Sequence, residues 1–334
     1  MTRLRRADCA GPGFRRRRQG RGFVYLDENG TRISDASLLE RLRGLVIPPA
    51  WKDVWICPWP NGHLQAVGTD AAGRRQYLYH PAWRERRDQE KFDRMLAFAR
   101  ALPLGRAAAS RHLAQPELTR NRVLACAFRL LDVGFFRVGG EVYAEENETF
   151  GLATLRKEHV TIDGNTVTFE YPAKNGSERL QSVVDPDVGD VVRALKRRRR
   201  GGAELLAHKG GNRWSDVRSS DINEYVKEIL GGDFSAKDFR TWHATVLATV
   251  ALGVSAQLSS ATARTRAVRR AYQEVSHYLG NTPAVSRRAY VDPRVVDRFH
   301  GGFTIADVFD APREAIEAAV IDLIEERAPI AQAA

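Results

Sequence analysis

The spacing of apolar residues changes near Trp83. Before this residue, short apolar runs alternate with turns that contain Gly, Pro and Asn, a pattern typical of β-strands. After it, apolar residues recur at helical spacing, as in Leu124, Phe128 and Leu131, which predicts amphipathic helices. Because strands and helices place side chains with different periods, one segment cannot satisfy both patterns. The sequence therefore predicts an α+β fold with a small, mainly β N-terminal part and a larger, mainly helical part.

The predicted N-terminal domain covers residues 1–82, and the predicted helical domain covers residues 83–334. In the first domain, the turn Glu28-Asn29-Gly30 predicts a β-hairpin between residues 22–26 and 31–33. A short helix is expected at residues 35–45, which Pro48-Pro49 follows. Three further strand candidates cover residues 54–57, 64–67 and 76–79.

One β-rich stretch interrupts the helical domain. Apolar and polar residues alternate around Asp163-Gly164, and a second turn follows at Asn175-Gly176. The alternating apolar residues are Val160, Ile162, Val167, Phe169 and Tyr171. A three-stranded sheet is expected here, with Lys174 in its second turn.

The net charge of +11 indicates a partner of opposite charge. A positive field raises the local concentration of polyanions, so nucleic acid is the first partner to consider. A basic protein adapted for solubility or for an acidic protein partner is the alternative. The basic runs at residues 15–18 and 196–200 are either solvated segments or phosphate contacts.

Cysteine usage and hydropathy narrow the class of protein further. The three cysteines, Cys9, Cys57 and Cys126, lie far apart and show no zinc-site or disulfide-framework spacing. No stretch approaches the ~18 apolar residues of a membrane span. We expect a cytoplasmic, nucleoid-associated protein with no membrane contact and no metal or other cofactor.

Two arginines lie in otherwise apolar segments. Arg137 follows Phe135-Phe136 and precedes two glycines, and Arg240 lies in KDFRTW ahead of an apolar helix. Arginine can contact two phosphate oxygens at once and neutralise their charge without a metal. A lone arginine beside aromatic residues is more often a packed stem with a solvated head, so neither position suffices by itself.

Tyr290 is expected near the end of a short helix that begins at Thr282-Pro283. Arg287 and Arg288 lie close by in the sequence. A phenol ionises near pH 10 and is a poor nucleophile unless cations favour the phenolate. Without further context, a tyrosine that packs its ring into the core is the commoner case.

Taken in order, these segments resemble the type IB DNA topoisomerases of the poxviral and bacterial kind. The matching segments are RVGGEVYAEENETFGLATL with Arg137, YPAKNG with Lys174, KDFRTW with Lys237 and Arg240, LGNTPAVSRRAY with Tyr290, and GRRQYLY at residues 73–79. The resemblance covers nearly the whole chain.

The resemblance implies a function and a role for each of these residues. Tyr290 would attack the scissile phosphate of double-stranded DNA, forming a 3′-phosphotyrosyl link and expelling a 5′-hydroxyl. Arg137 and Arg240 would stabilise the transition state, and Lys174 would act as general acid, with Lys237 in a proton relay. Because the link conserves the energy of the broken bond, supercoiled DNA would be relaxed without ATP or metal.

The resemblance also suggests further contacts and an architecture. Asn281 stands where poxviral members carry a histidine, and its amide can donate a hydrogen bond to the same phosphate oxygen. Two lobes would form a C-shaped clamp, and the protein would act as a monomer. The additional residues expected to touch DNA are Arg74, Gln76, Tyr77, Tyr79 and Tyr143.

Two other functions remain open at this point. A tyrosine recombinase would share the Arg, Lys, Arg, Tyr set, but recombinases typically carry a histidine where this chain has Lys237. Their N-terminal domains are also usually helical. A non-catalytic DNA-binding protein would use the basic surface alone and would be indifferent to Tyr290.

Overall fold

The computed structural model describes residues 3–326 except 175, 212 and 259, and the side chains of Val142, Tyr143 and Ala306 are not among those described. The chain divides into two compact units, residues 1–93 and 94–334. A long helix, α2 (Pro81–Leu113), runs through the division. The boundary expected between residues 82 and 83 stays a prediction, because this helix crosses it without a break.

The first unit is built on a five-stranded antiparallel sheet in the order β2-β1-β3-β4-β5. Two apolar clusters form its core. In one, Leu42 of the short helix α1 (Ala36–Gly44) packs with Ile56. In the other, Trp55 packs with Val67. The elements are β1 (Phe14–Gln19), β2 (Gly22–Leu26), α1 (Ala36–Gly44), β3 (Lys52–Ile56), β4 (Leu64–Thr69) and β5 (Arg75–Tyr79). The predicted β-rich character of this region is confirmed.

The predicted hairpin forms only next to its turn. Leu26 and Arg32 form an antiparallel bridge, and the amides of Asp27 and Ile33 donate to the carbonyls of Thr31 and Tyr25. Strand β2 pairs along its length with β1, which was not predicted. The arginine run at residues 15–18 is therefore a strand. Arg16 donates to the carbonyls of Ile47, Pro48 and Trp51, so this part of the run holds the fold together.

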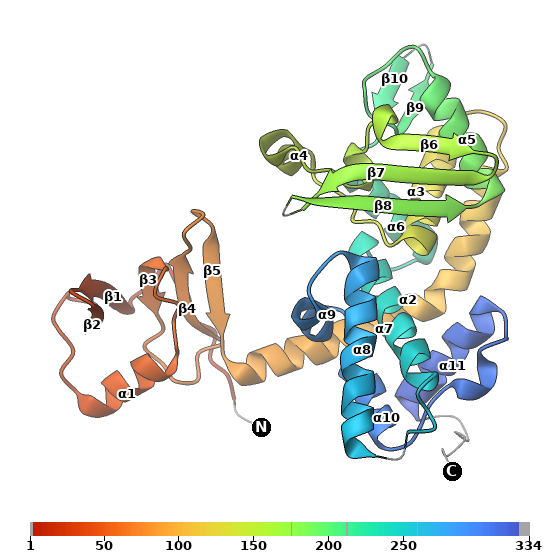
Figure 1. Ribbon diagram of the computed structural model, residues 1–334. Helices are drawn as coiled ribbons and strands as arrows, with labels where there is room; N and C mark the ends of the chain where they lie inside the picture. The colour runs from red at the N-terminus through yellow and green to blue at the C-terminus, as the bar shows by residue number, and fades with distance from the viewer. Residues whose placement is uncertain (1–2, 175, 212, 259, 327–334) are drawn as a thin grey trace. The chain divides into compact units, whose positions relative to one another are not determined.

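The second unit is mainly helical, as predicted (Figure 1). Its centre is formed by α3 (Arg120–Gly134) and α7 (Ala236–Gly253), which bury large side chains such as Phe128, Phe239 and Trp242. The helices that follow α2 are given in chain order. They are α3 (Arg120–Gly134), α4 (Glu141–Asn147), α5 (Pro186–Arg197), α6 (Ser219–Leu230), α7 (Ala236–Gly253), α8 (Ala261–Leu279), α9 (Pro283–Ala289), α10 (Pro293–His300) and α11 (Arg313–Glu325).

The predicted three-stranded insertion is confirmed. It consists of β6 (Val160–Asp163), β7 (Thr166–Ala173) and β8 (Ser177–Val184), paired antiparallel in that order. In β7, the buried side chains Val167 and Phe169 alternate with more accessible ones, as expected for a sheet with one covered face. A small hairpin of β9 (Ala207–Gly210) and β10 (Arg213–Asp216) was not anticipated.

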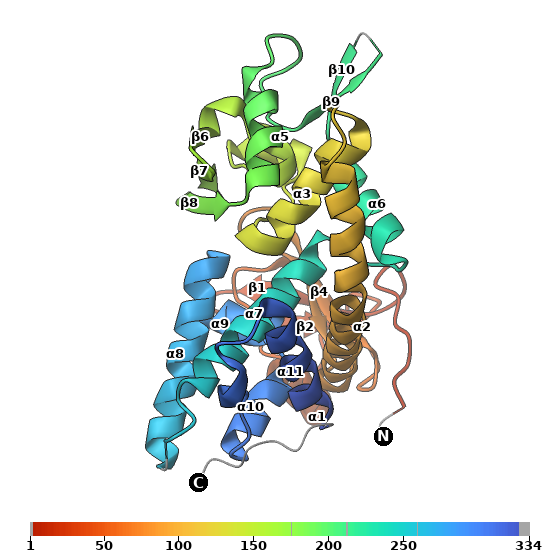
Figure 2. The same cartoon turned by 90° about the vertical axis from the view of Figure 1, so that its right-hand side faces the viewer.

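Helices α7 and α8 lie side by side below this sheet, and both views show α8 ending near it (Figures 1 and 2). A buried cluster joins the two helices through Ala244, Val275 and Leu279.

None of the helices within the described residues is long and apolar enough to cross a membrane.

Candidate active site

The C-terminal end of α8 is where most of the predicted catalytic residues meet. Gly280 ends the helix with φ of 59°, a left-handed conformation that glycine adopts at little cost. Helix ends leave backbone carbonyls that need donors from elsewhere. Three arginines supply them: Arg179 donates to the oxygens of His277 and Tyr278 (3.2 and 2.7 Å), Arg240 to Leu279 (2.7 Å), and Arg137 to Gly280 (2.8 Å).

In the part of the chain that the structure describes, neutral carbonyls rather than carboxylates therefore hold these three guanidinium groups together. The negative end of the helix dipole favours cations at this position, yet the cluster keeps its net positive charge. Burial, followed by the nearby charge of Arg137, lowers the pKa of Arg240 to about 10. Burial also lowers the pKa of Arg179. Such a cluster gains from an anion that enters it.

Tyr290 follows α9 directly and lies against this cluster. The guanidinium carbon of Arg240 is 5.3 Å from the centre of the tyrosine ring. Burial of the phenol opposes its ionisation, but the surrounding cations outweigh that effect and lower the pKa of Tyr290. The cations responsible are Arg240, Arg137 and Lys237. The tyrosine is therefore more easily ionised than an ordinary phenol.

Local sequence explains how Tyr290 is placed. The hydroxyl of Thr282 accepts from the Val285 amide and caps α9, whose first residue is Pro283, as predicted. The hydroxyl of Thr245 on α7 donates to the Tyr290 carbonyl at 3.3 Å. The nucleophile candidate is thus tied to the same helix that carries Arg240.

Asn281 follows Gly280 and contributes a buried amide. Its Oδ1 accepts from the hydroxyl of the fully buried Ser286 at 2.6 Å. Its Nδ2 is buried and has no hydrogen-bond partner among the described residues. The same holds for Nε of Arg240. Since buried donors are nearly always paired, two unpaired donors in one site indicate a place for an acceptor from outside the protein.

The two predicted lysines occupy different elements. Lys237 is exposed on the first turn of α7, three residues before Arg240, and it lies close enough to favour the phenolate of Tyr290. Lys174 is exposed in the turn that follows β7. The structure thus gathers Arg137, Lys237, Arg240 and Asn281 around Tyr290 or the end of α8. It places Lys174 after β7, in the hairpin whose other strand reaches the end of α8 through Arg179.

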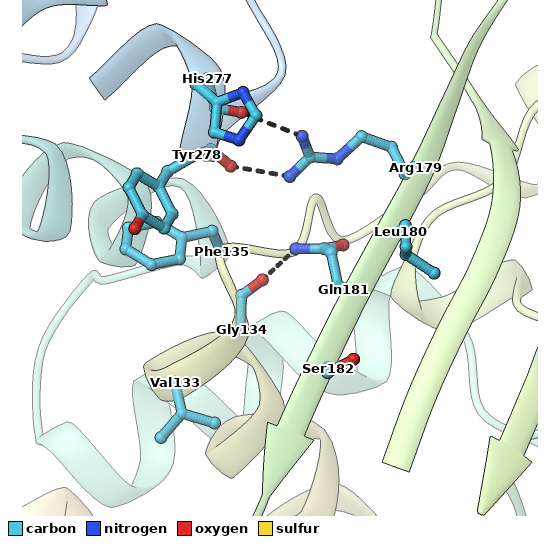
Figure 3. A pocket seen from close by; sticks show the side chains of 9 residues that line it. All are labelled: Val133, Gly134, Phe135, Arg179, Leu180, Gln181, Ser182, His277 and Tyr278. Atoms are coloured by element: carbon cyan, nitrogen blue, oxygen red, sulfur yellow. Dashed lines mark hydrogen bonds between the residues drawn. The ribbon is translucent and has the colours of Figure 1, made fainter. Parts of the chain in front are cut away.

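The sequence did not lead us to predict a role for Arg179. It lies on β8, and Gln181 two residues later donates to the carbonyl of Gly134 at the end of α3 (Figure 3). Val183 is buried, and alternate residues of a strand share a face. An arginine and a glutamine on the inward face of a strand were the clue that could have revealed these two contacts.

A buried ionic network behind the site was also missed. Asp132 at the end of α3 accepts from Arg106 (2.9 Å) and Arg313 (2.8 Å). His243 Nε2 lies 3.4 Å from the same carboxylate, and its ring contacts Phe135. The carbonyl of Phe135 in turn accepts from Arg240 at 2.7 Å. The network therefore supports the backbone that holds an active-site arginine.

The residues expected to touch DNA from the first unit lie on or next to β5. Asp70 accepts from both Arg74 (3.0 Å) and Gln76 (2.9 Å). Tyr77 and Tyr79 share a face of the strand, their ring centres 6.2 Å apart, and Tyr77 is exposed. The side chain of Tyr143, the remaining member of the set, lies outside the described ones.

The second unit combines a mainly helical fold with a tyrosine held among arginines, which defines the class of enzymes that cut nucleic acid through a protein tyrosine. The comparisons make this specific. The family described as "Eukaryotic DNA topoisomerase I, catalytic core" matches residues 80–300, and "Bacterial DNA topoisomerase IB, N-terminal domain" matches residues 22–70. The chain belongs to the type IB DNA topoisomerase family.

Individual relatives agree with this assignment. DNA topoisomerase 1B of Acanthamoeba polyphaga mimivirus is 30% identical over 292 residues, which are 84% of this chain and 85% of the relative. DNA topoisomerase 1B of Vaccinia virus is 24% identical over 299 residues, 83% of this chain and 87% of the relative. DNA topoisomerase 1 of Schizosaccharomyces pombe is 32% identical over 131 residues, 39% of this chain and only 15% of that larger protein.

Proposed function

We propose that this type IB topoisomerase cuts DNA with Tyr290 as its nucleophile. One observation carries the proposal: Tyr290 lies beside a cluster of arginines whose pairing partners are neutral carbonyls. The cluster keeps its positive charge for the phosphate and favours the phenolate. A recombinase and a non-catalytic DNA-binding protein, the two alternatives from the sequence, have no support from the family assignment.

In the cleavage step, the phenolate oxygen of Tyr290 attacks the phosphorus, and the bond from phosphorus to the 5′-oxygen breaks. Lys174 gives a proton to that oxygen, which leaves as a 5′-hydroxyl, while Lys237 relays protons. The DNA 3′ end stays bound as a phosphotyrosine. Religation is the reverse step, and it needs no ATP because one phosphodiester bond has been exchanged for another.

Transition-state charge on the non-bridging oxygens requires donors that are already in place. Arg137 and Arg240 supply guanidinium groups fixed by the end of α8. The unpaired Nδ2 of Asn281 supplies a further N–H. Because these donors are ordered before DNA arrives, little reorganisation is needed when the charge develops.

For the first unit, we propose that β5 contributes DNA contacts. Arg74 and the hydroxyls of Tyr77, which is exposed, and of the neighbouring Tyr79 would reach phosphates. Gln76 would reach a base edge, the usual division between positioning and sequence-dependent contacts. Tyr143 would add a contact from the second unit. We further propose that the protein acts as a monomer in a bacterial cytoplasm.

Plasmid relaxation tests the proposal. Supercoiled plasmid is incubated with the protein in chelator and without ATP, and covalent protein–DNA adducts are trapped with denaturant. We expect relaxation and adducts with the wild type and neither with Tyr290→Phe. Tyr272→Phe is the matched control, because Tyr272 packs on the same cluster as Tyr290 while burial raises its pKa. Relaxation by Tyr290→Phe at the wild-type rate would contradict the proposal.

A further inference from the structure

Arg179 connects two elements that carry different parts of the proposed chemistry. It projects from β8 across a small pocket, and its two terminal nitrogens donate to the carbonyls of His277 and Tyr278 (Figure 3). Strand β8 is half of the hairpin whose turn holds Lys174. Beyond those carbonyls, the chain continues through Gly280 and Asn281 into the helix that leads to Tyr290.

The contact is close and leaves little room for change. A Cβ atom added to Gly280 would lie 2.9 Å from a terminal nitrogen of Arg179, so the guanidinium group packs directly against the helix end. On the other side, Arg179 is paired across the sheet with Tyr171. Tyr171 is buried, and its hydroxyl donates to Gln181 at 2.7 Å. The helix end therefore fixes the guanidinium group of Arg179, and the pairing of β7 with β8 fixes the backbone from which it projects.

The register shows how this contact bears on Lys174. Tyr171, opposite Arg179, precedes Lys174 by three residues, which is about 10 Å along an extended strand. Arg179 is thus the anchor nearest the turn that reaches the helix end, while Gln181 anchors the same strand to α3 further along. Without Arg179, the turn would lose its contact with the end of α8, while the rest of the hairpin would keep its contact with α3.

We propose that Arg179 is a positioning residue for strand cleavage: it fastens the β7–β8 hairpin to the C-terminal end of α8 and thereby places Lys174 at the leaving 5′-oxygen. This inference rests on the proposed function, since it takes Lys174 as the general acid. Arg179 acts through Lys174 and does not donate the proton itself. A displacement of about 1 Å at a reacting group can cost about 100-fold in rate.

The test uses the full chain and two otherwise identical DNA substrates in single-turnover cleavage. One carries the normal oxygen at the scissile 5′ position, and the other carries sulfur there. A thiolate leaves without a proton from the enzyme, because a thiol ionises far more readily than an alcohol. The sulfur substrate therefore removes the need for a correctly placed acid and leaves the need for Arg137 unchanged.

We expect Arg179→Ala to cleave the oxygen substrate about 100-fold more slowly than the wild type and the sulfur substrate at nearly the wild-type rate. Arg179→Lys keeps the charge and the packed stem but lacks the planar fork that bridges two carbonyls. Arg179→Lys should cleave the oxygen substrate at least about tenfold more slowly than the wild type. The same comparison can be made with this variant if Arg179→Ala does not fold. Arg193→Ala is the control, because Arg193 donates to the Gly164 carbonyl at the opposite turn of β7.

The outcomes separate this inference from the proposed function. If Lys174→Ala is rescued by sulfur but Arg179→Ala is not, Lys174 remains the acid and the positioning role of Arg179 is wrong. If sulfur does not rescue Lys174→Ala, the assignment of the acid itself fails. Wild-type cleavage of the oxygen substrate by Arg179→Lys, or equal slowing by Arg193→Ala, would also overturn the positioning role.

Discussion

The unpaired amide of Asn281 leads to a prediction about the relation between stability and catalysis. In the free protein, Nδ2 is buried without a partner, while Oδ1 accepts from Ser286. An unpaired buried donor costs about 1–3 kcal/mol, and a typical hydrogen bond contributes about 1 kcal/mol. Asn281→Ala removes the unpaired donor, but it also leaves the buried hydroxyl of Ser286 without its acceptor, at a cost of the same order. The two effects oppose each other, so the free energy of unfolding should change by no more than about 2 kcal/mol in either direction.

Catalysis should respond differently, because Nδ2 gains its acceptor only when the phosphate is present. A hydrogen bond to a charged group contributes about 1.5–3 kcal/mol, and each 1.36 kcal/mol corresponds to about tenfold in rate. Asn281→Ala should therefore cleave DNA about 10- to 150-fold more slowly. Asn281→Asp keeps the acceptor for Ser286 but puts negative charge among Arg137 and Arg240, and it should be slower still. Asn281→His keeps a donor and should retain most activity.

Single-turnover cleavage at saturating enzyme measures the rate, and urea unfolding measures the stability. Gln115→Ala is a suitable control, because Gln115 also accepts from a hydroxyl, that of Thr119 at 2.7 Å, at the end of α3 remote from Phe135. Wild-type cleavage by Asn281→Ala would refute the donor role. A loss of stability as large as the increase in activation free energy would show that the variant acts through folding instead.

Two further predictions concern pH and the buried network. Because neighbouring cations lower the pKa of Tyr290, the cleavage rate should rise with pH and level off below about pH 10. Arg137→Ala removes one of these cations and should move the plateau to higher pH. Profiles of rate against pH that have the same shape in the wild type and in Arg137→Ala would contradict this. Asp132→Asn should cost about 3–5 kcal/mol in urea unfolding, since Arg106 loses a buried partner. Hydrogen bonds from His243 and Arg106 outweigh burial and hold the pKa of Asp132 well below its usual range. The stabilisation by Asp132 is therefore full at neutral pH and is lost as pH falls below about 4. If the wild type and Asp132→Asn had the same free energy of unfolding at every pH, this role of Asp132 would be wrong.

Much of the fold follows from local pattern. The three later strands of the first unit, the helix at Ala36–Gly44 and the three-stranded insertion all lie close to their predicted positions. Each of these segments buries one face, so its period appears in the residues themselves. The pairing of β1 with β2 could not be predicted in this way, because a run of arginines has no apolar face and becomes a strand only through its partner.

The sequence by itself determined which residues are candidates for catalysis. Arg137, Lys174, Arg240 and Tyr290 stand in the order of a known family, and a tyrosine among cations in that order admits few chemistries. These properties depend on residue types and order alone.

Only the tertiary structure decided how those residues are held. Arg179 reaches carbonyls that are 98 and 99 positions away in the chain, and Asp132 meets Arg313 across 181 positions. Backbone carbonyls are present in every residue, so an arginine bound to them leaves no complementary charge in the sequence. The carbonyls at the end of α8 bind these three guanidinium groups only because packing brings the arginines to that helix end.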